Sequence, residues 1–126
     1  MEKTILIVVR DRDTRELLAQ TFAGHGFRAP CASDVVSGLF QLGLVQPDLV
    51  VLDANGWETL RQIRALSNVP IIALIEDDPM ARIESLDQGA DYYVTKPPSL
   101  RELEAKARAL FRRGPALCVR TVCADR

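Results

Sequence analysis

Residue types that mark several common functional classes are scarce in this sequence. Its 126 residues contain one histidine, His25, and three cysteines without CxxC spacing, Cys31, Cys118 and Cys123. Structural zinc sites use clusters of cysteine and histidine at short spacings, so a zinc site has no support here. An odd number of cysteines favours reduced thiols over a disulfide framework, and we therefore expect a cytoplasmic protein.

Long apolar runs and a dominant charge are missing as well. The N-terminal apolar run, Ile5–Val9, has five residues. A membrane-spanning helix needs about 20, and a secretory leader also needs a longer run. The 16 basic and 17 acidic side chains leave a formal charge of −1, which gives no overall field for nucleic acid. The patterns GxxxxGK(S/T), GxGxxG, GxSxG and HExxH do not occur, so the sequence does not indicate an enzyme.

What the sequence does contain is a regular alternation of apolar runs and helical periodicity. Buried strands are predicted at Ile5–Val9, Leu49–Leu52 and Ile71–Ile75, with weaker ones at 27–32 and 92–95. A helix ending at Gly24–Gly26 follows the first strand, and further helices are predicted at about 34–46, 55–66, 79–88 and 99–113. Five βα units predict an α/β fold, with a parallel sheet between helices on both faces and right-handed crossovers. In such sheets the functional crevice lies at the carboxyl ends of the strands.

Four stretches in this pattern carry a family resemblance. They are Ile5–Val8 leading into Arg15–Leu18, then Pro47–Asp53, Val69–Leu74 and Gly89–Pro97. Together they cover roughly Lys3 to Arg113 and resemble the receiver domains of bacterial response regulators. The resemblance implies a doubly wound, flavodoxin-like (CheY-like) sheet with strand order 2-1-3-4-5. It also implies that Asp53 stands at the phosphoacceptor position, Lys96 at the family's lysine and Tyr93 at the switch aromatic.

The same comparison shows departures around the acceptor. Receivers hold Mg²⁺ with two acidic side chains after the first strand, but Val9 and Arg10 occupy those positions here. Asp11 comes one residue too late, which on a strand reverses the side-chain direction. Ile75 replaces the switch hydroxyl, and the loop after Asp53 is about five residues shorter than usual.

From these departures we expect no cofactor and poor Mg²⁺ binding. A metal site made by Asp11 and Asp53 would remain only if a degenerate site persists. Our hypothesis is that Arg10 takes the place of the metal and, with Lys96, pairs with Asp53, because a guanidinium can bind a carboxylate through two hydrogen bonds. The alternative is that Arg10 points into solvent.

The last helix resembles the winged-helix (OmpR/PhoB-like) class of regulators. In that class the receiver dimerises through its fourth helix, fifth strand and fifth helix. The corresponding positions are Arg82, Asp91, Tyr92, Glu102, Lys106 and Arg113. Tyr92 replaces an acid opposite Lys106, so one ion pair is lost, and a simply solvated helix face is the alternative. We assign 1–113 to the receiver and 114–126 to a linker, or to the start of a missing C-terminal domain that would be a winged-helix DNA-binding domain.

The favoured interpretation is a regulatory domain, not an enzyme. It would act as a homodimer on a DNA-binding output, independently of Mg²⁺-dependent phosphorylation and without a membrane. The first alternative is a conventional receiver that takes phosphate on Asp53 from a histidine kinase. The second is a small-molecule sensor, which would need an apolar, enclosed pocket near Val9, Ile75 and Tyr93.

Overall fold

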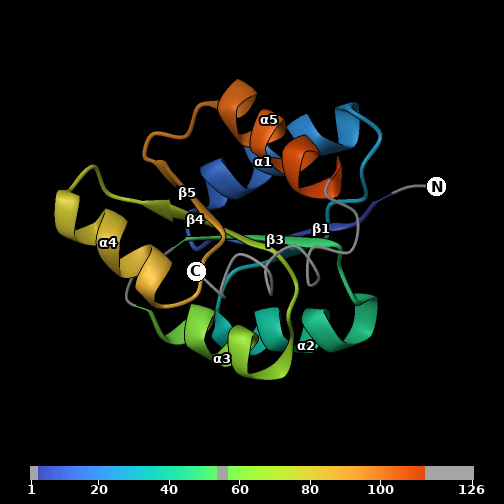
Figure 1. Ribbon diagram of the computed structural model, residues 1–126. Helices are drawn as coiled ribbons and strands as arrows, with labels where there is room; N and C mark the ends of the chain where they lie inside the picture. The colour runs from blue at the N-terminus through green and yellow to red at the C-terminus, as the bar shows by residue number, and fades with distance from the viewer. Residues whose placement is uncertain (1–2, 54–56, 113–126) are drawn as a thin grey trace.

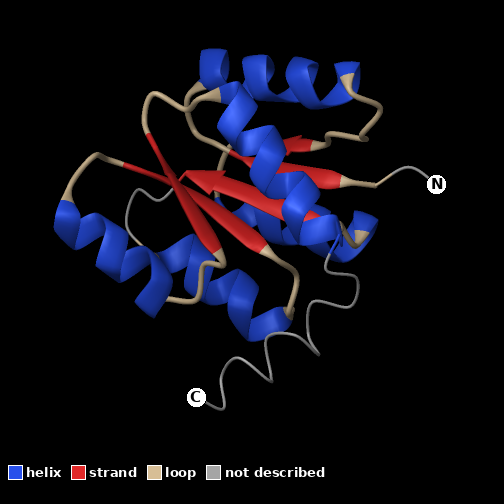
Figure 2. Ribbon diagram, turned by 45° about the horizontal axis from the view of Figure 1, so that its top comes forward, coloured by secondary structure: helices blue, strands red, loops and turns tan. Residues whose placement is uncertain are grey.

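A computed structural model describes residues 3–53 and 57–112 and shows one five-stranded parallel sheet (Figures 1 and 2). The strand order is β2-β1-β3-β4-β5, as the sequence predicted. The strands are β1 (Ile5–Val8), β2 (Cys31–Ala32), β3 (Leu49–Asp53), β4 (Ile71–Ile75) and β5 (Tyr92–Thr95). The helices are α1 (Arg12–Gly24), α2 (Val35–Val45), α3 (Glu58–Leu66), α4 (Pro79–Asp87) and α5 (Leu100–Arg112).

The sheet separates two hydrophobic layers. On one side Ile5 and Ile7 of β1 pack with α1 and α5, and on the other Leu6 and Val8 pack with α2 and α3. Figure 1 shows α1 and α5 above the sheet and α2 and α3 below it. Because successive side chains on a strand point to opposite faces, a strand covered on both faces must be apolar at every position. The uninterrupted apolar runs therefore became the central strands.

Aspartates begin three of the helices. Asp11, Asp34 and Asp78 each accept a hydrogen bond from a backbone N–H in the first turn of α1, α2 and α4, which satisfies donors that the helix leaves unpaired. The predicted cap at Asp78 is thereby confirmed. The predicted capping box of α3 is not seen, because Trp57 precedes this helix without a side-chain cap and Asn55 lies outside the described residues.

Two further expectations concern the ends of the described region. Ser99 Oγ accepts a hydrogen bond from the Glu102 N–H at 3.2 Å, as expected at the start of the last helix. The proposed linker at 114–126, and Arg113 before it, lie outside the described residues. Within the described part of the chain, none of the helices has the length and apolar character that crossing a membrane requires.

Candidate functional site

The carboxyl ends of the strands surround a pocket of about 440 Å³. It is lined by Val9, Asp11, Thr14, Asp53, Leu74, Glu76, Lys96, Pro97 and Pro98. These residues follow β1, β3, β4 and β5, so the pocket lies where a parallel sheet is expected to have its functional crevice. Three carboxylates face one ammonium group there, which gives the lining a formal charge of −2.

An ion pair between Asp53 and Lys96 forms the centre of this pocket. The Lys96 Nζ lies 2.5 Å from the Asp53 Oδ1, and only 8% of the Asp53 side chain is exposed. The same ammonium lies 3.5 Å from Glu76 Oε2, on a glutamate that is 76% exposed. Asp53 and Lys96 are 43 positions apart in sequence, and the β3-β4-β5 order brings them together. The pair places a nearly buried carboxylate beside a cation that can also bind an anion.

Asp11, by contrast, is committed to its own helix. Its Oδ2 accepts hydrogen bonds from the Thr14 N–H at 2.9 Å and from the Thr14 hydroxyl at 2.6 Å. These two bonds, the hydroxyl's first, lower the pKa of Asp11 below its ordinary value. Asp11 therefore lines the pocket as a helix cap, and its Oδ2 already accepts two hydrogen bonds.

The two positions before Asp11 supply no acidic oxygen. Val9 is 1% exposed and packs in the core beside the pocket. The carbonyl oxygens of Val9 and Arg10 both accept hydrogen bonds from Arg15 Nη1, at 2.8 and 3.1 Å. Sequence reasoning did not predict this role for Arg15, since no local pattern shows that a side chain in α1 reaches back to the loop before it.

Arg10 does not take the place proposed for it. Among the described residues, no ion pair joins Arg10 to Asp53. Arg10 is exposed and lines a small cleft of about 30 Å³ with Asp53 and Asp34. Hydrogen bonds from Ser37 lower the pKa of Asp34, and the charge of Arg10 adds a smaller effect in the same direction. The hypothesis placed both Arg10 and Lys96 on Asp53; the described part of the chain shows the Lys96 pair, whereas Arg10 is exposed and makes no ion pair with Asp53.

Ile75 and Tyr93 also lie elsewhere than predicted. Both pack in the hydrophobic layer of α2 and α3, and neither lines either pocket that Asp53 lines. On β4 it is Leu74 that faces the larger pocket, and alternation directs Ile75 to the opposite side. Val9, Asp11 and Lys96 thus line the larger pocket with Asp53, and Arg10 lines the smaller cleft.

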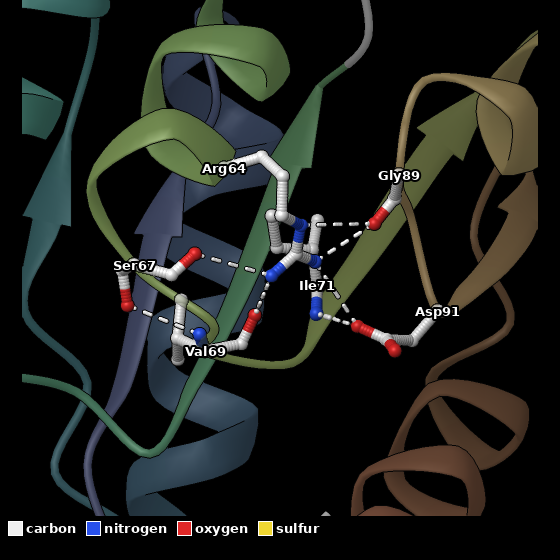
Figure 3. Close-up of polar contacts among 6 residues, drawn as sticks. All are labelled: Arg64, Ser67, Val69, Ile71, Gly89 and Asp91. Atoms are coloured by element: carbon white, nitrogen blue, oxygen red, sulfur yellow. Dashed lines mark hydrogen bonds and ion pairs between the residues drawn. The ribbon is translucent and has the colours of Figure 1, made fainter. Parts of the chain in front are cut away.

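Asp91, one of the predicted dimer-interface residues, is bound within the chain instead. Figure 3 shows its Oδ2 between two donors, Arg64 Nη2 at 3.2 Å and the Ile71 N–H at 2.8 Å. Arg64 further donates to the carbonyls of Gly89 and Val69, at 2.7 and 2.8 Å. The Asp91 side chain is 8% exposed, so little of it is available to a partner surface. This cluster joins the end of α3 to the starts of β4 and β5.

Of the other predicted interface residues that the structure describes, one lies on α4 (Arg82), one on β5 (Tyr92) and two on α5 (Glu102 and Lys106). Arg82 pairs with Asp77 at 2.5 Å, and Lys106 pairs with Glu102 at 3.2 Å. The Lys106 Nζ also lies 5.5 Å from the ring centres of both Tyr92 and Tyr93. Lys106 of α5 therefore makes a cation–π contact with Tyr92 in place of the ion pair that an acid at position 92 would form.

Comparisons with known proteins agree on one family. The model of the response regulator receiver domain matches residues 5–108. The chain is 38% identical over 120 residues to the response regulator MprA of Mycobacterium bovis (strain BCG / Pasteur 1173P2), covering 90% of this chain and 52% of MprA. The chain spans about half the length of the curated relatives it matches.

Solved structures extend this agreement to three dimensions. The receiver domain of the TMAO respiratory system response regulator TorR is 32% identical, with a TM-score of 0.82, over 88% of this chain and 98% of that one. The chemotaxis protein CheY4 of Vibrio cholerae is 21% identical, with a TM-score of 0.80, over 86% of this chain and 98% of that one. The second likeness bears on the fold alone.

Proposed function

The chain belongs to the response regulator receiver family, and from this premise we propose that it is an atypical receiver that works without a Mg²⁺-dependent phosphorylation cycle. It is a two-component signalling domain with the CheY-like fold. The proposal further holds that it has no enzymatic activity of its own. Its conformation would depend on binding events rather than on phosphate at Asp53.

The observation that carries the proposal is the set of oxygen donors beside Asp53. Mg²⁺ requires several oxygen ligands in near-octahedral geometry. The Val9 side chain offers no oxygen. The carbonyl oxygens of Val9 and Arg10 already accept hydrogen bonds from Arg15. Asp11 Oδ2 already accepts two hydrogen bonds from Thr14. Within the described ranges, no three acidic, histidine or cysteine side chains are grouped so that they could hold a metal. This donor set does not fit the ion.

The output and the dimer are parts of the same proposal. The curated relatives extend well beyond the length of this chain, which supports an attached output domain that would bind DNA. On the face formed by α4, β5 and α5, helix α4 exposes Met80 (60%), Ile83 (56%) and Leu86 (48%), and α5 contributes the contact of Lys106 with Tyr92. Exposed apolar side chains rimmed by charges are typical of protein interfaces. We therefore propose this face for homodimerisation, without Asp91.

Labelling with phosphoramidate tests the central claim. The chain is incubated with and without Mg²⁺, and the mass of the intact protein reports any phosphoryl adduct. We expect no Mg²⁺-dependent adduct, because the ion that neutralises the phosphoryl oxygens has too few ligands. Asp53→Asn is the control for the attachment site. Stoichiometric, Mg²⁺-dependent labelling of the wild-type chain that Asp53→Asn abolishes refutes the proposal.

A gain-of-function variant sharpens this test. Replacing Val9 and Arg10 together by aspartate restores the acidic pair that the family places there. We expect this variant to bind Mg²⁺ at millimolar concentration and the wild type not to, with the fluorescence of Trp57 as the readout. Equal titration curves for the two proteins would show that the acids at these positions do not decide metal binding.

One observation favours a conventional receiver as the alternative function. Asp11, Asp53 and Glu76 line one pocket with a single ammonium group, so its charge attracts cations. A metal could then be held by ligands other than the family's, if Asp11 released Thr14. The sensor alternative is weaker: the pocket volume of about 440 Å³ suits a small ligand, but its lining is charged and lacks Ile75 and Tyr93.

A further inference from the structure

Helix α2 has an apolar face that the rest of the described chain leaves uncovered. Between Val35 and Val45 it contains no charged residue. Its inner side packs on the sheet through Leu42 and Gly38. Its outer side carries Val36, Phe40 and Leu44, which are 78%, 68% and 66% exposed. Large apolar side chains that gather on an exposed face are typical of an interaction surface, so this outer face calls for a partner.

We call these three residues the α2 stripe, and the surface around it enlarges it. The neighbouring helix α3 exposes Leu66 by 69%, and a hollow of about 520 Å³ lies between Leu66 and Gly43 of α2. Figure 1 shows α2 and α3 side by side below the sheet. On the other flank, Val36 and Phe40 line a second hollow of about 510 Å³ next to β2. The exposed apolar surface therefore spans the width of α2.

We propose that this surface binds a second copy of the chain through antiparallel α2 helices. Val36 and Leu44 each stand four residues from Phe40, about 6 Å along the helix axis. A two-fold axis at Phe40 therefore places each Val36 against the partner's Leu44 and the two Phe40 rings against each other. The stripe is its own complement, which is the condition for an isologous interface. Residues spaced by four also form the ridge that packs in the commonest class of helix pairs.

The charge and area of the surface agree with this occupant. Two uncharged helices meet without repulsion, whereas a polyanion such as nucleic acid would find no cation on the stripe. An exposed aromatic or leucine of this kind contributes on the order of 100 Å², so with Leu66 the apolar part reaches about 400 Å². A stable dimer buries about 800 Å² on each side, with an apolar centre and a polar rim. Ser37, Gln41 and Gln46 supply such a rim.

Sedimentation of the full chain from about 10 μM to about 1 mM tests the proposal. We expect the wild type to associate and Phe40→Glu to weaken the association by at least about 100-fold, since two carboxylates would meet on the axis. Phe40→Ala should weaken it by about tenfold. Phe40 is exposed, so each variant should keep the wild-type circular dichroism. Leu17→Glu on α1 is the matched control, because Leu17 is a 50% exposed apolar residue outside both proposed faces, and it should leave the association intact.

The outcomes separate this inference from the dimer proposed above. Nuclear Overhauser contacts between Val36 and Leu44 methyls in a sample mixed from labelled and unlabelled chains would support the antiparallel arrangement. Association that Ile83→Glu abolishes and Phe40→Glu leaves unchanged overturns the α2 inference and supports the α4 face. A wild-type chain that remains monomeric at about 1 mM overturns it as well, whatever else covers the stripe.

Discussion

Replacing Arg64 by methionine should cost the domain a large part of its stability. The guanidinium of Arg64 donates to Gly89 O at 2.7 Å, to Val69 O at 2.8 Å and to Asp91 Oδ2 at 3.2 Å. Its side chain is 22% exposed and that of Asp91 is 8% exposed. Methionine would fill most of the space but leave a nearly buried carboxylate with the Ile71 N–H as a remaining donor. Breaking a buried pair from one side costs about 3–5 kcal/mol.

Because Arg64 is partly solvated, we expect the lower end, a loss of about 3 kcal/mol from a total of about 5–15 kcal/mol. Urea denaturation followed by the fluorescence of Trp57 measures this loss as a fall in Cm at constant m. Arg61→Met, on the exposed side of the same helix, is the matched control and should change the free energy of unfolding by less than about 0.5 kcal/mol. Equal effects of the two substitutions would refute the reasoning that the buried contacts of Arg64 carry the stability.

Two other predictions concern the site and the sheet-facing side of α2. Thr14→Val should raise the pKa of Asp11, because the hydroxyl bond is the largest cause of its lowering; carbon-13 NMR of the carboxyl measures it. A lowered pKa stabilises the fold above the unfolded pKa of about 4, so the stability lost in Thr14→Val should be seen at neutral pH and vanish in acid. An unchanged titration would contradict this. Gly38→Ala should lower the free energy of unfolding by about 1 kcal/mol, because the added Cβ would lie 3.2 Å from a Val8 methyl carbon. Gly43→Ala should raise the free energy of unfolding by about 0.5–1 kcal/mol, because its Cβ would meet no atom within 4 Å. Thermal melts at low protein concentration measure both changes.

The strands and most helix ends were predictable because their causes are local. Apolar runs such as Ile71–Ile75 can be covered only inside a doubly covered sheet, and Asp78 before Pro79 is a standard helix start. The strand signal at 27–32 is weak for a local reason as well, because the strand that forms there, β2, has two residues and follows Pro30. The helix start predicted at Asn55 lies outside the described residues, and α3 begins at Glu58 after Trp57.

The candidate site was only partly predictable. Asp53 and Lys96 could be assigned from family positions, and their contact follows once the strand order is known. The role of Arg10 was predicted from charge alone, but a long flexible side chain has many directions, and of the two predicted partners of Asp53 the structure shows Lys96. Asp91 was placed on a surface by analogy, whereas it lies before β5 and its partner Arg64 is 27 positions away in α3.

By itself, the sequence determined the order of strands and helices, the family, and the residue types that surround the acceptor carboxylate. These depend on local periodicity and on the order of residues along the chain. Only the tertiary structure decided that Arg10 makes no ion pair with Asp53, that Thr14 and Arg15 donate to oxygens of the first loop, and that the α2 stripe stays uncovered by the described residues. These features depend on distances between elements far apart in sequence, and such distances are fixed by packing and not by neighbours in the chain.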